Sequence, residues 1–298
     1  MKRSTVLEQD FPASSRAIAS RWPSPLTGEE WDRRFPGVLD GVAFMTGGAN
    51  VIMQLGRPGV GYGVVESRVH SGSVFKNPIK RMRTTFTYLA VAMLGTTEEK
   101  LAYRAAVNAS HAQVRSTASS PVKYNAFDPG LQLWVAACLF WGVLDTMEKF
   151  RGKLTPAQVD ELLELTKPLA TTLQVKPEMW PKTAAEFETY FESELGRVHI
   201  DAHVRGYLRK LVDLEFAHPV VSGTIGPITR YFTIGFLPPK FRDEMEYEWT
   251  PLDQKIFEII LGAANTVNRH VPRVIRQAPS LVMMWDFRRR VRKGLPLV

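Results

Sequence analysis

Cysteine is nearly absent from this chain of 298 residues, which contains one, Cys138. A single thiol cannot form an intramolecular disulfide, so the sequence gives no sign of an oxidising compartment. Zinc sites built from several cysteines and iron–sulfur clusters held by one chain's thiolates are excluded for the same reason. Any metal or redox chemistry in this protein must therefore use other ligands.

Long apolar runs are missing as well. The longest one, residues 131–144, is shorter than the ~20 residues that cross a bilayer. Gln132 interrupts it, and we interpret it as a core helix. The basic residues Lys2 and Arg3 are followed by no apolar stretch. We therefore expect no signal peptide and a cytoplasmic protein.

Alternating strand patterns are scarce, and no repeat of about 20–50 residues is visible. Helical signals dominate, and no linker divides the chain. Residues 1–35 are rich in proline, serine and charge, which predicts a loosely held N-terminal arm. We expect the remainder, residues 36–298, to fold as one all-α domain.

The chain is basic, with a net charge of +8. This charge favours anionic partners but does not choose among nucleic acid, anionic lipid and an anionic cofactor. The basic run at residues 288–293 could contact nucleic acid or lipid headgroups, but cations at a helix C-terminus also complement the helix dipole. It lacks the interleaved aromatics of a base-stacking platform. We interpret it as a solvated tail, expect no nucleic-acid partner, and leave peripheral contact with an anionic membrane open.

N-cap residues followed by a proline or by a polar partner three residues on recur along the chain. Apolar spacing adds helices over residues 38–55 and 78–94, while the glycines at 56–63 predict a loop. The helix after Thr96 should reach about residue 115, and the helix after Asp128 should cover residues 129–148. The cap patterns predict helices that begin at Thr96, Asp128, Thr155, Thr183 and Thr250.

His111 is the histidine that stands out. It shares one predicted helix face with Val107 and Val114, and alanines around it leave room for a bulky group. A neutral imidazole in an apolar helical core is a ready axial ligand for haem iron. The alternative from the residues alone is a core histidine that is hydrogen-bonded to a backbone carbonyl.

The preceding helix carries Arg81, Thr85 and Tyr88 on one face. A buried arginine needs an acidic partner or an anion, and a haem propionate, a phosphate or a bound oxygen species would serve. The alternative is an ion pair of Arg81 with Glu66 or Asp128, together with a hydrogen bond from Thr85 back to its own helix.

Two further patterns are weaker. The glycines at residues 59–63 lack the spacing of a phosphate-binding loop and follow no strand, so we read a turn between helices. His199 and His203 lie four residues apart, as two metal ligands on a helix could. The HExxH pattern is absent, however, and a polar helix face explains both histidines.

Nine short segments between residues 30 and 280 are informative together, through their order and their spacing along the chain. They are GVVES at 63–67, PIKRMRTT at 78–85, LGTT at 94–97, HAQVR at 111–115, YNAFDP at 124–129, LWV at 133–135, WPKTAAEFETYF at 180–191, GFLPPKFR at 235–242 and PRVIRQAP at 272–279. In these segments the chain resembles the MpaB-type oxygenase family, which includes the latex-clearing rubber oxygenases.

The resemblance implies an all-helical fold with a globin-like core around haem b. It implies that His111 is the proximal iron ligand, that Arg81 and Thr85 occupy the Arg-x-x-x-Thr motif, and that Glu66 is a catalytic base. Rubber oxygenases can carry a distal capping lysine where this chain has Thr84, so we expect no lysine to close the distal face. Rubber oxygenases are secreted, whereas this sequence shows no export signal. We therefore expect a substrate that is smaller than polyisoprene, of prenyl or lipid-like chemistry.

The sequence thus predicts a haem-b-dependent oxygenase acting with O2 on a small hydrophobic substrate. His111 would hold the iron, its second ring nitrogen donating to a carbonyl or carboxylate. Arg81, Thr84 and Thr85 would line the haem site, and Glu66 would take a proton. Trp134, Phe140 and Trp141 would wall the haem or the substrate tunnel. The alternative is a non-catalytic helical module that binds a hydrophobic ligand.

Overall fold

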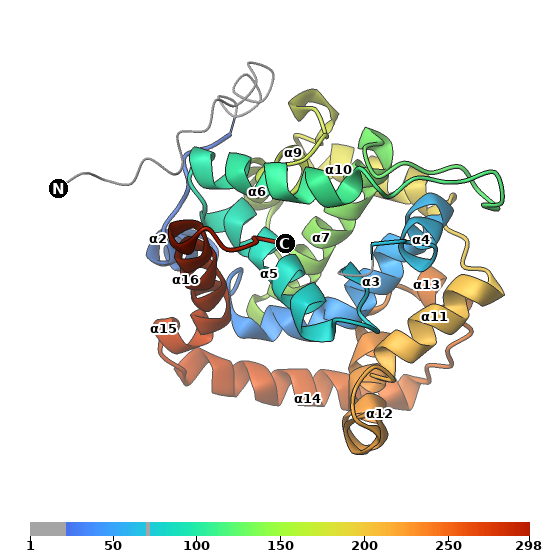
Figure 1. The fold of residues 1–298 in the computed structure, drawn as a ribbon. Helices are drawn as coiled ribbons and strands as arrows, with labels where there is room; N and C mark the ends of the chain where they lie inside the picture. Colours follow the sequence, from blue (N-terminus) through green and yellow to red (C-terminus); the bar gives the residue numbers. More distant parts are fainter. Residues whose placement is uncertain (1–21, 70–71) are drawn as a thin grey trace.

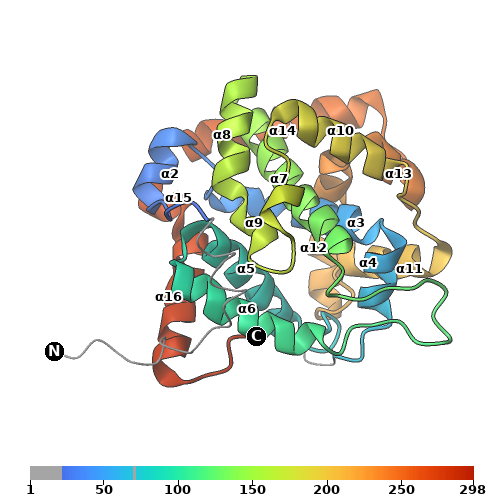
Figure 2. The same ribbon diagram turned by 90° about the horizontal axis from the view of Figure 1, so that it is seen from above.

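The computed structural model describes residues 22–69 and 72–298. Over these ranges the chain is all-α, as the sequence predicts, and it forms no strand beyond an isolated bridge between Arg115 and Asn125. The helices surround α7, which runs through the middle of the molecule (Figure 1, Figure 2). The elements are α2 (Gly28–Arg34), η1 (Gly41–Thr46), α3 (Gly47–Leu55), α4 (Pro58–Val65), α5 (Pro78–Leu94), α6 (Thr97–His111), α7 (Pro129–Arg151), α8 (Pro156–Thr166), α9 (Pro168–Thr171), η3 (Pro177–Met179), α10 (Ala184–Leu195), α11 (Ala202–Val212), α12 (Pro219–Phe236), α13 (Pro239–Met245), α14 (Pro251–His270), α15 (Arg273–Arg276) and α16 (Ala278–Lys293).

The helix starts follow the predicted caps. The hydroxyl of Thr96 accepts from the backbone N–H of Glu99 while the Glu99 carboxylate accepts from the N–H of Thr96, so α6 begins with a complete capping box. Thr155 and Thr250 begin α8 and α14 in the same way. Asp128 accepts from two backbone N–H groups of α7. Each such cap typically stabilises a helix by about 1 kcal/mol.

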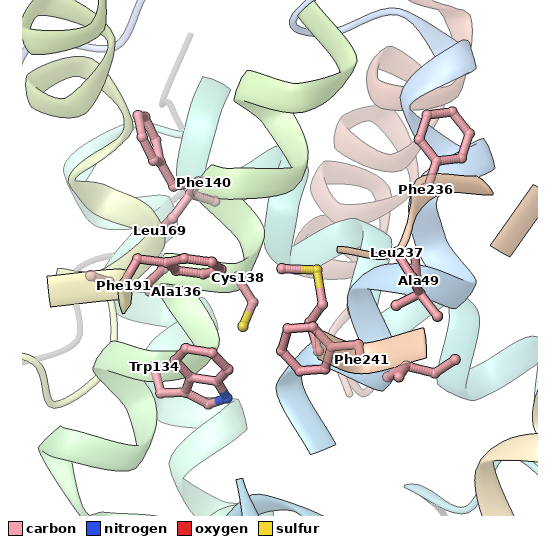
Figure 3. Close-up of a cluster of buried hydrophobic side chains, with 14 of the residues drawn as sticks. Ala49, Trp134, Ala136, Cys138, Phe140, Leu169, Phe191, Phe236, Leu237 and Phe241 are labelled. Carbon is pink, nitrogen blue, oxygen red and sulfur yellow. The ribbon is translucent and has the colours of Figure 1, made fainter. Parts of the chain in front are cut away.

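Helix α7 is the core helix that the sequence predicts. By length and composition it is the one helix among the described residues that could cross a membrane. Its Trp134, Cys138 and Phe140 are fully buried within the protein. Trp134 stacks against Phe191 of α10, with ring centroids 5.5 Å apart, and these side chains form the cluster in Figure 3. The apolar surface of α7 is therefore covered by other helices of the same chain.

The predicted loop at residues 56–63 is wrong, because residues 58–65 form α4. Pro58 occupies the first turn, where its missing N–H costs nothing. The glycines allow close packing: a Cβ on Gly61 would lie 2.7 Å from the carbonyl oxygen of Leu55. The glycines here permit close helix packing and do not break the helix.

Two other predicted boundaries also differ from the structure. Residues 38–55 divide into η1 and α3, and α6 ends at His111, short of residue 115.

The expected loose arm is packed from residue 22 onward, and residues 1–21 lie outside the described range. Trp31 of α2 is fully buried, and its indole N–H donates to the carbonyl of Met93. The following segment is fixed by Asp40, which accepts two hydrogen bonds of 2.6 Å from Arg276. This end of the chain therefore belongs to the helical domain.

The basic C-terminal run is also ordered, which corrects the expectation of a solvated tail. It forms the end of α16, which packs against α5. Arg288 makes an ion pair with Glu99 of α6, and Arg290 pairs with Asp286 one turn earlier. Three of the run's residues thus bind acids of the same chain, since Arg289 also reaches Asp286.

Candidate functional site

A cavity of about 340 Å3 lies between the middle helices and a loop before α5. Its size is within the usual range of small-molecule and cofactor sites. Apolar side chains form most of the wall, including the Leu131, Val135 and Leu139 face of α7. The polar side chains on the wall are Gln54, Ser67, Ser73, Lys80, Arg81, Thr84, Tyr88, Ser110, His111, Tyr124, Asn125, Gln132 and Tyr207.

His111 lines this cavity at the C-terminal end of α6. The helix ends there because the chain turns back, with the N–H of Val114 donating to the carbonyl of His111. Burial and the nearby Arg81 lower the pKa of His111 to about 4. The imidazole is therefore neutral at pH 7, which leaves a nitrogen lone pair free to bind a metal.

One of the two ring nitrogens of His111 does not have a hydrogen-bond partner of the expected kind. Nδ1 of His111 is buried and accepts or donates no hydrogen bond among the described residues. The prediction of a carbonyl or carboxylate beside it is therefore wrong for this nitrogen. Buried polar atoms are nearly always satisfied in folded proteins, so an orphaned imidazole nitrogen at a cavity wall is a feature to explain.

Arg81 also lines the cavity, one element away on α5. Protein surrounds its guanidinium, and burial lowers the pKa of Arg81 while leaving it charged. By its accessible surface Arg81 is nevertheless an exposed residue, and it lines the cavity. The alternative ion pairs with Glu66 or Asp128 do not form, and Arg81 has no ion pair within the described part of the chain. The described wall contains no Asp or Glu side chain, and Val298, the last residue of the sequence, also lines it.

The two threonines of α5 take different positions. Thr84 lines the cavity, and its hydroxyl donates to the carbonyl of Lys80. Thr85 is not on the wall. Its hydroxyl donates to the carbonyl of Arg81 at 3.1 Å, which is the hydrogen bond back to its own helix that the sequence offered as the alternative. Lys80 does line the cavity, one turn before Thr84. The expectation that no lysine closes the distal face from position 84 stays a prediction.

Glu66 lies behind the cavity wall. Its Oε2 accepts hydrogen bonds from Ser120 at 2.6 Å and from the Tyr124 hydroxyl at 2.7 Å. Tyr124 is itself on the wall, and burial together with Glu66 raises the pKa of Tyr124. Glu66 therefore reaches the cavity through the phenol of Tyr124.

Tyr207 is a site residue that the sequence analysis missed. It comes from α11, lines the cavity, and packs edge-on against Phe75 with ring centroids 5.1 Å apart. Its hydroxyl has no hydrogen-bond partner among the described residues, and burial raises the pKa of Tyr207. No spacing rule connects it with Arg81, 126 positions earlier, because only the tertiary fold brings α11 to α5. Tyr88 is different, since its hydroxyl donates to the carbonyl of Leu169.

The remaining predictions concern residues away from the cavity. Trp134, Phe140 and Trp141 are not on its wall; they face α10, so the predicted wall of the site is wrong for all three. His199 is exposed beside Glu244, and His203 stacks on Tyr62. Across the described residues, no group of three or more His, Cys, Asp and Glu side chains could hold a metal ion.

Comparison with known proteins gives one family. A family model described as "ER-bound oxygenase mpaB/B'/Rubber oxygenase, catalytic domain" matches residues 37–266. The proteins Rv2237 of Mycobacterium tuberculosis and Mb2261 of Mycobacterium bovis, both named as uncharacterized, are each 46% identical to this chain over 250 residues. The aligned region covers 84% of this chain and 98% of each relative. No solved structure matches the chain.

Proposed function

Because this chain belongs to the family of ER-bound oxygenase mpaB/B′ and rubber oxygenase catalytic domains, we propose that it is a haem-b-dependent oxygenase. Its substrate would be apolar, of isoprenoid or lipid-like chemistry, and O2 would be the second reactant. The observation that carries this proposal is the His111 imidazole. It is neutral, it lines an apolar cavity, and its buried Nδ1 has no partner among the described residues.

The other wall residues suit the anionic groups of a haem. Haem b carries two propionates, and the wall offers the cations Lys80 and Arg81 while its described residues include no Asp or Glu side chain. A guanidinium binds a carboxylate through two parallel hydrogen bonds. Arg81 would therefore hold a propionate, with the Thr84 hydroxyl beside it on the same helix face.

When bound, haem iron would supply the centre at which O2 is activated. The apolar wall would exclude water and take up the hydrocarbon part of a substrate. Glu66 would serve as the proton acceptor. The Tyr124 hydroxyl would pass its proton to Oε2 of Glu66 and receive one from a carbon of the substrate, which keeps the proton count balanced. With Arg81 on a propionate, the Tyr207 hydroxyl is a wall donor that would remain free to orient an oxygen atom.

Titration of the purified protein with hemin tests this assignment. We expect one hemin per chain with a sharp Soret band, and we expect His111→Ala to lose at least about tenfold in affinity and to show a spectrum without a nitrogen ligand. His199→Ala is the matched control, because His199 is 72% exposed and lies outside the cavity. A normal Soret band in His111→Ala would overturn the assignment.

A second candidate function is the binding of a hydrophobic ligand, which the apolar wall and the absence of a partner for Nδ1 among the described residues also allow. A cavity with these properties could hold a hydrophobic ligand without any haem. This protein would then be a binding module that keeps the fold of an oxygenase. The hemin titration separates the two functions, since the binding module stays colourless with hemin but binds an apolar fluorescent probe in the same cavity.

A further inference from the structure

An uncharged, apolar segment lies on the outside of the molecule at the start of α12. Residues 219–229 contain no charged side chain. Val221, Ile225 and Ile228 share one helix face by their spacing and are between 40% and 52% exposed. Soluble proteins expose single apolar residues commonly, but a contiguous apolar helix face marks a contact surface.

Hydrogen bonds and close packing hold this face outward. On the adjoining, inner flank of α12, Ser222 donates to the carbonyl of Asp213, and Thr229 donates to the carbonyl of Val212, both at the end of α11. A Cβ on Gly226 would lie 2.6 Å from the Asp213 carbonyl oxygen. The inner side of the helix is thus fixed on α11 and cannot rotate to bury the apolar side.

Helix α14 continues this surface with a second outward stripe. Its inner side buries Phe257 and Leu261, while Ile256, Ile259 and Val267 are between 41% and 71% exposed. The two helices meet where Phe232 of α12 contacts Phe257, with ring centroids 6.2 Å apart. We call the residues Val221, Ile225, Ile228, Ile256, Ile259 and Val267 the apolar face. In Figure 1, α12 and α14 lie along the lower edge of the molecule.

The charges beside the apolar face indicate its occupant. Its α14 flank carries Lys255, Glu258 and Arg269, and neither cation has an acidic partner among the described residues. The whole chain carries a net charge of +8. In a twofold dimer the patch would meet itself, and with two cations to one acid on each rim the contact would carry an excess of positive charge. Anionic lipid headgroups would instead neutralise Lys255 and Arg269.

We propose that the apolar face docks on the surface of an anionic lipid bilayer. The exposed aliphatic side chains of α12 and α14 enter the boundary between headgroups and acyl chains, and the helices lie in the plane of the interface. Lys255 and Arg269 contact the headgroups. No residue of the cavity wall takes part in this docking, so its test is independent of haem binding.

Co-sedimentation with vesicles tests the proposal on the full chain. We expect binding to phosphatidylcholine vesicles that contain phosphatidylglycerol, weaker binding to phosphatidylcholine alone, and loss of binding as salt rises. Ile225→Asp and Ile259→Asp should each lower the association constant at least about tenfold. The double variant Lys255→Gln/Arg269→Gln should lower it on anionic vesicles only, roughly fivefold for each charge.

Leu295→Asp is the matched control, because Leu295 is also exposed but follows α16, outside the apolar face. A label provides a readout that does not depend on a destabilising charge. Cys138 is buried, so a polarity-sensitive dye on Ile259→Cys reports that site alone. Its emission should shift to the blue with anionic vesicles, whereas a dye on Leu295→Cys should not shift.

Three results would overturn membrane docking. The first is wild-type protein that stays in the supernatant with anionic vesicles. The second is binding that Ile225→Asp and Ile259→Asp leave unchanged. The third is a dimer in solution that Ile259→Asp converts to a monomer, since a second copy would then cover the apolar face.

Discussion

At the scale of single residues, the site depends on what surrounds each side chain. His111 is at a helix C-terminus, where the helix dipole favours the charged imidazolium. Burial and the charge of Arg81 oppose the dipole and prevail, so the pKa falls to about 4. Desolvation keeps the imidazole neutral and able to bind iron, and it raises the free energy of the protonated form. The stability of the fold should therefore depend on pH.

The apo-protein should lose stability in acid through His111. An unfolded histidine binds a proton near pH 6.5, whereas native His111 binds one only near pH 4. Between these values the unfolded state holds more protons, so lowering the pH favours unfolding, by up to about 3 kcal/mol in total. Urea unfolding from pH 7 to pH 4 should therefore show a steeper loss for wild type than for His111→Leu. Parallel curves for the two proteins would contradict a neutral, desolvated imidazole.

Sequence reasoning found part of the site. Helical spacing brought His111 and Arg81 to notice, and both line the cavity. The spacing could not predict that Thr84 and not Thr85 lines the cavity. Neighbouring side chains differ by 100° around the helix axis, and only the packed structure shows which of the two directions faces the cavity. Tyr207 was out of reach, since its approach to Arg81 depends on how α11 packs across the fold.

At the scale of elements, local chemistry predicted the helix starts at the capped positions, but it did not predict α2, α4, α12 or α13. Capping boxes act within one turn, so Thr96 and Thr155 could be recognised without tertiary information. Helix α4 was read as a loop because glycine disfavours helices intrinsically. In the structure Gly61 lies against the end of α3 and Gly59 against Leu131 of α7, so close packing outweighs the low propensity, and only the fold shows this.

Gly61→Ala should test this account of α4. The added Cβ would lie 2.7 Å from the backbone oxygen of Leu55. We expect a loss of roughly 1–3 kcal/mol in the free energy of unfolding, despite alanine's better helix propensity. Gly206→Ala in α11 is the control, because a Cβ there meets nothing within 4 Å. It should stabilise the protein by up to about 1 kcal/mol. Equal effects in urea unfolding would refute the packing role of Gly61.

At the scale of the whole molecule, buried charges connect the two ends of the described chain. Asp40, whose side chain is fully buried, accepts from Arg276 of α15, from Asn268 of α14 and from Arg151 of α7. This network joins segments that are up to 236 residues apart. The composition predicted one all-α domain, but it could not show that Asp32 of the supposed N-terminal arm joins this network through Arg276.

Asp40→Ala should be strongly destabilising, because it leaves Arg276 buried without its main partner. We expect a loss of about 3–5 kcal/mol in the free energy of unfolding, measured in urea. Glu29→Ala removes an exposed acid that lies 3.9 Å from Arg273 and should change stability by less than about 1 kcal/mol. A small effect of Asp40→Ala would show that the two ends fold without this network.

The central claim is that the His111 imidazole binds haem iron. Resonance Raman spectroscopy of the ferrous, hemin-reconstituted protein tests it most directly, because the stretching vibration between iron and an imidazole nitrogen is observed as a separate band. We predict this band in the wild-type protein, its loss in His111→Gly, and its return when free imidazole fills the space left by the side chain. The same band in His111→Gly without added imidazole would contradict the account.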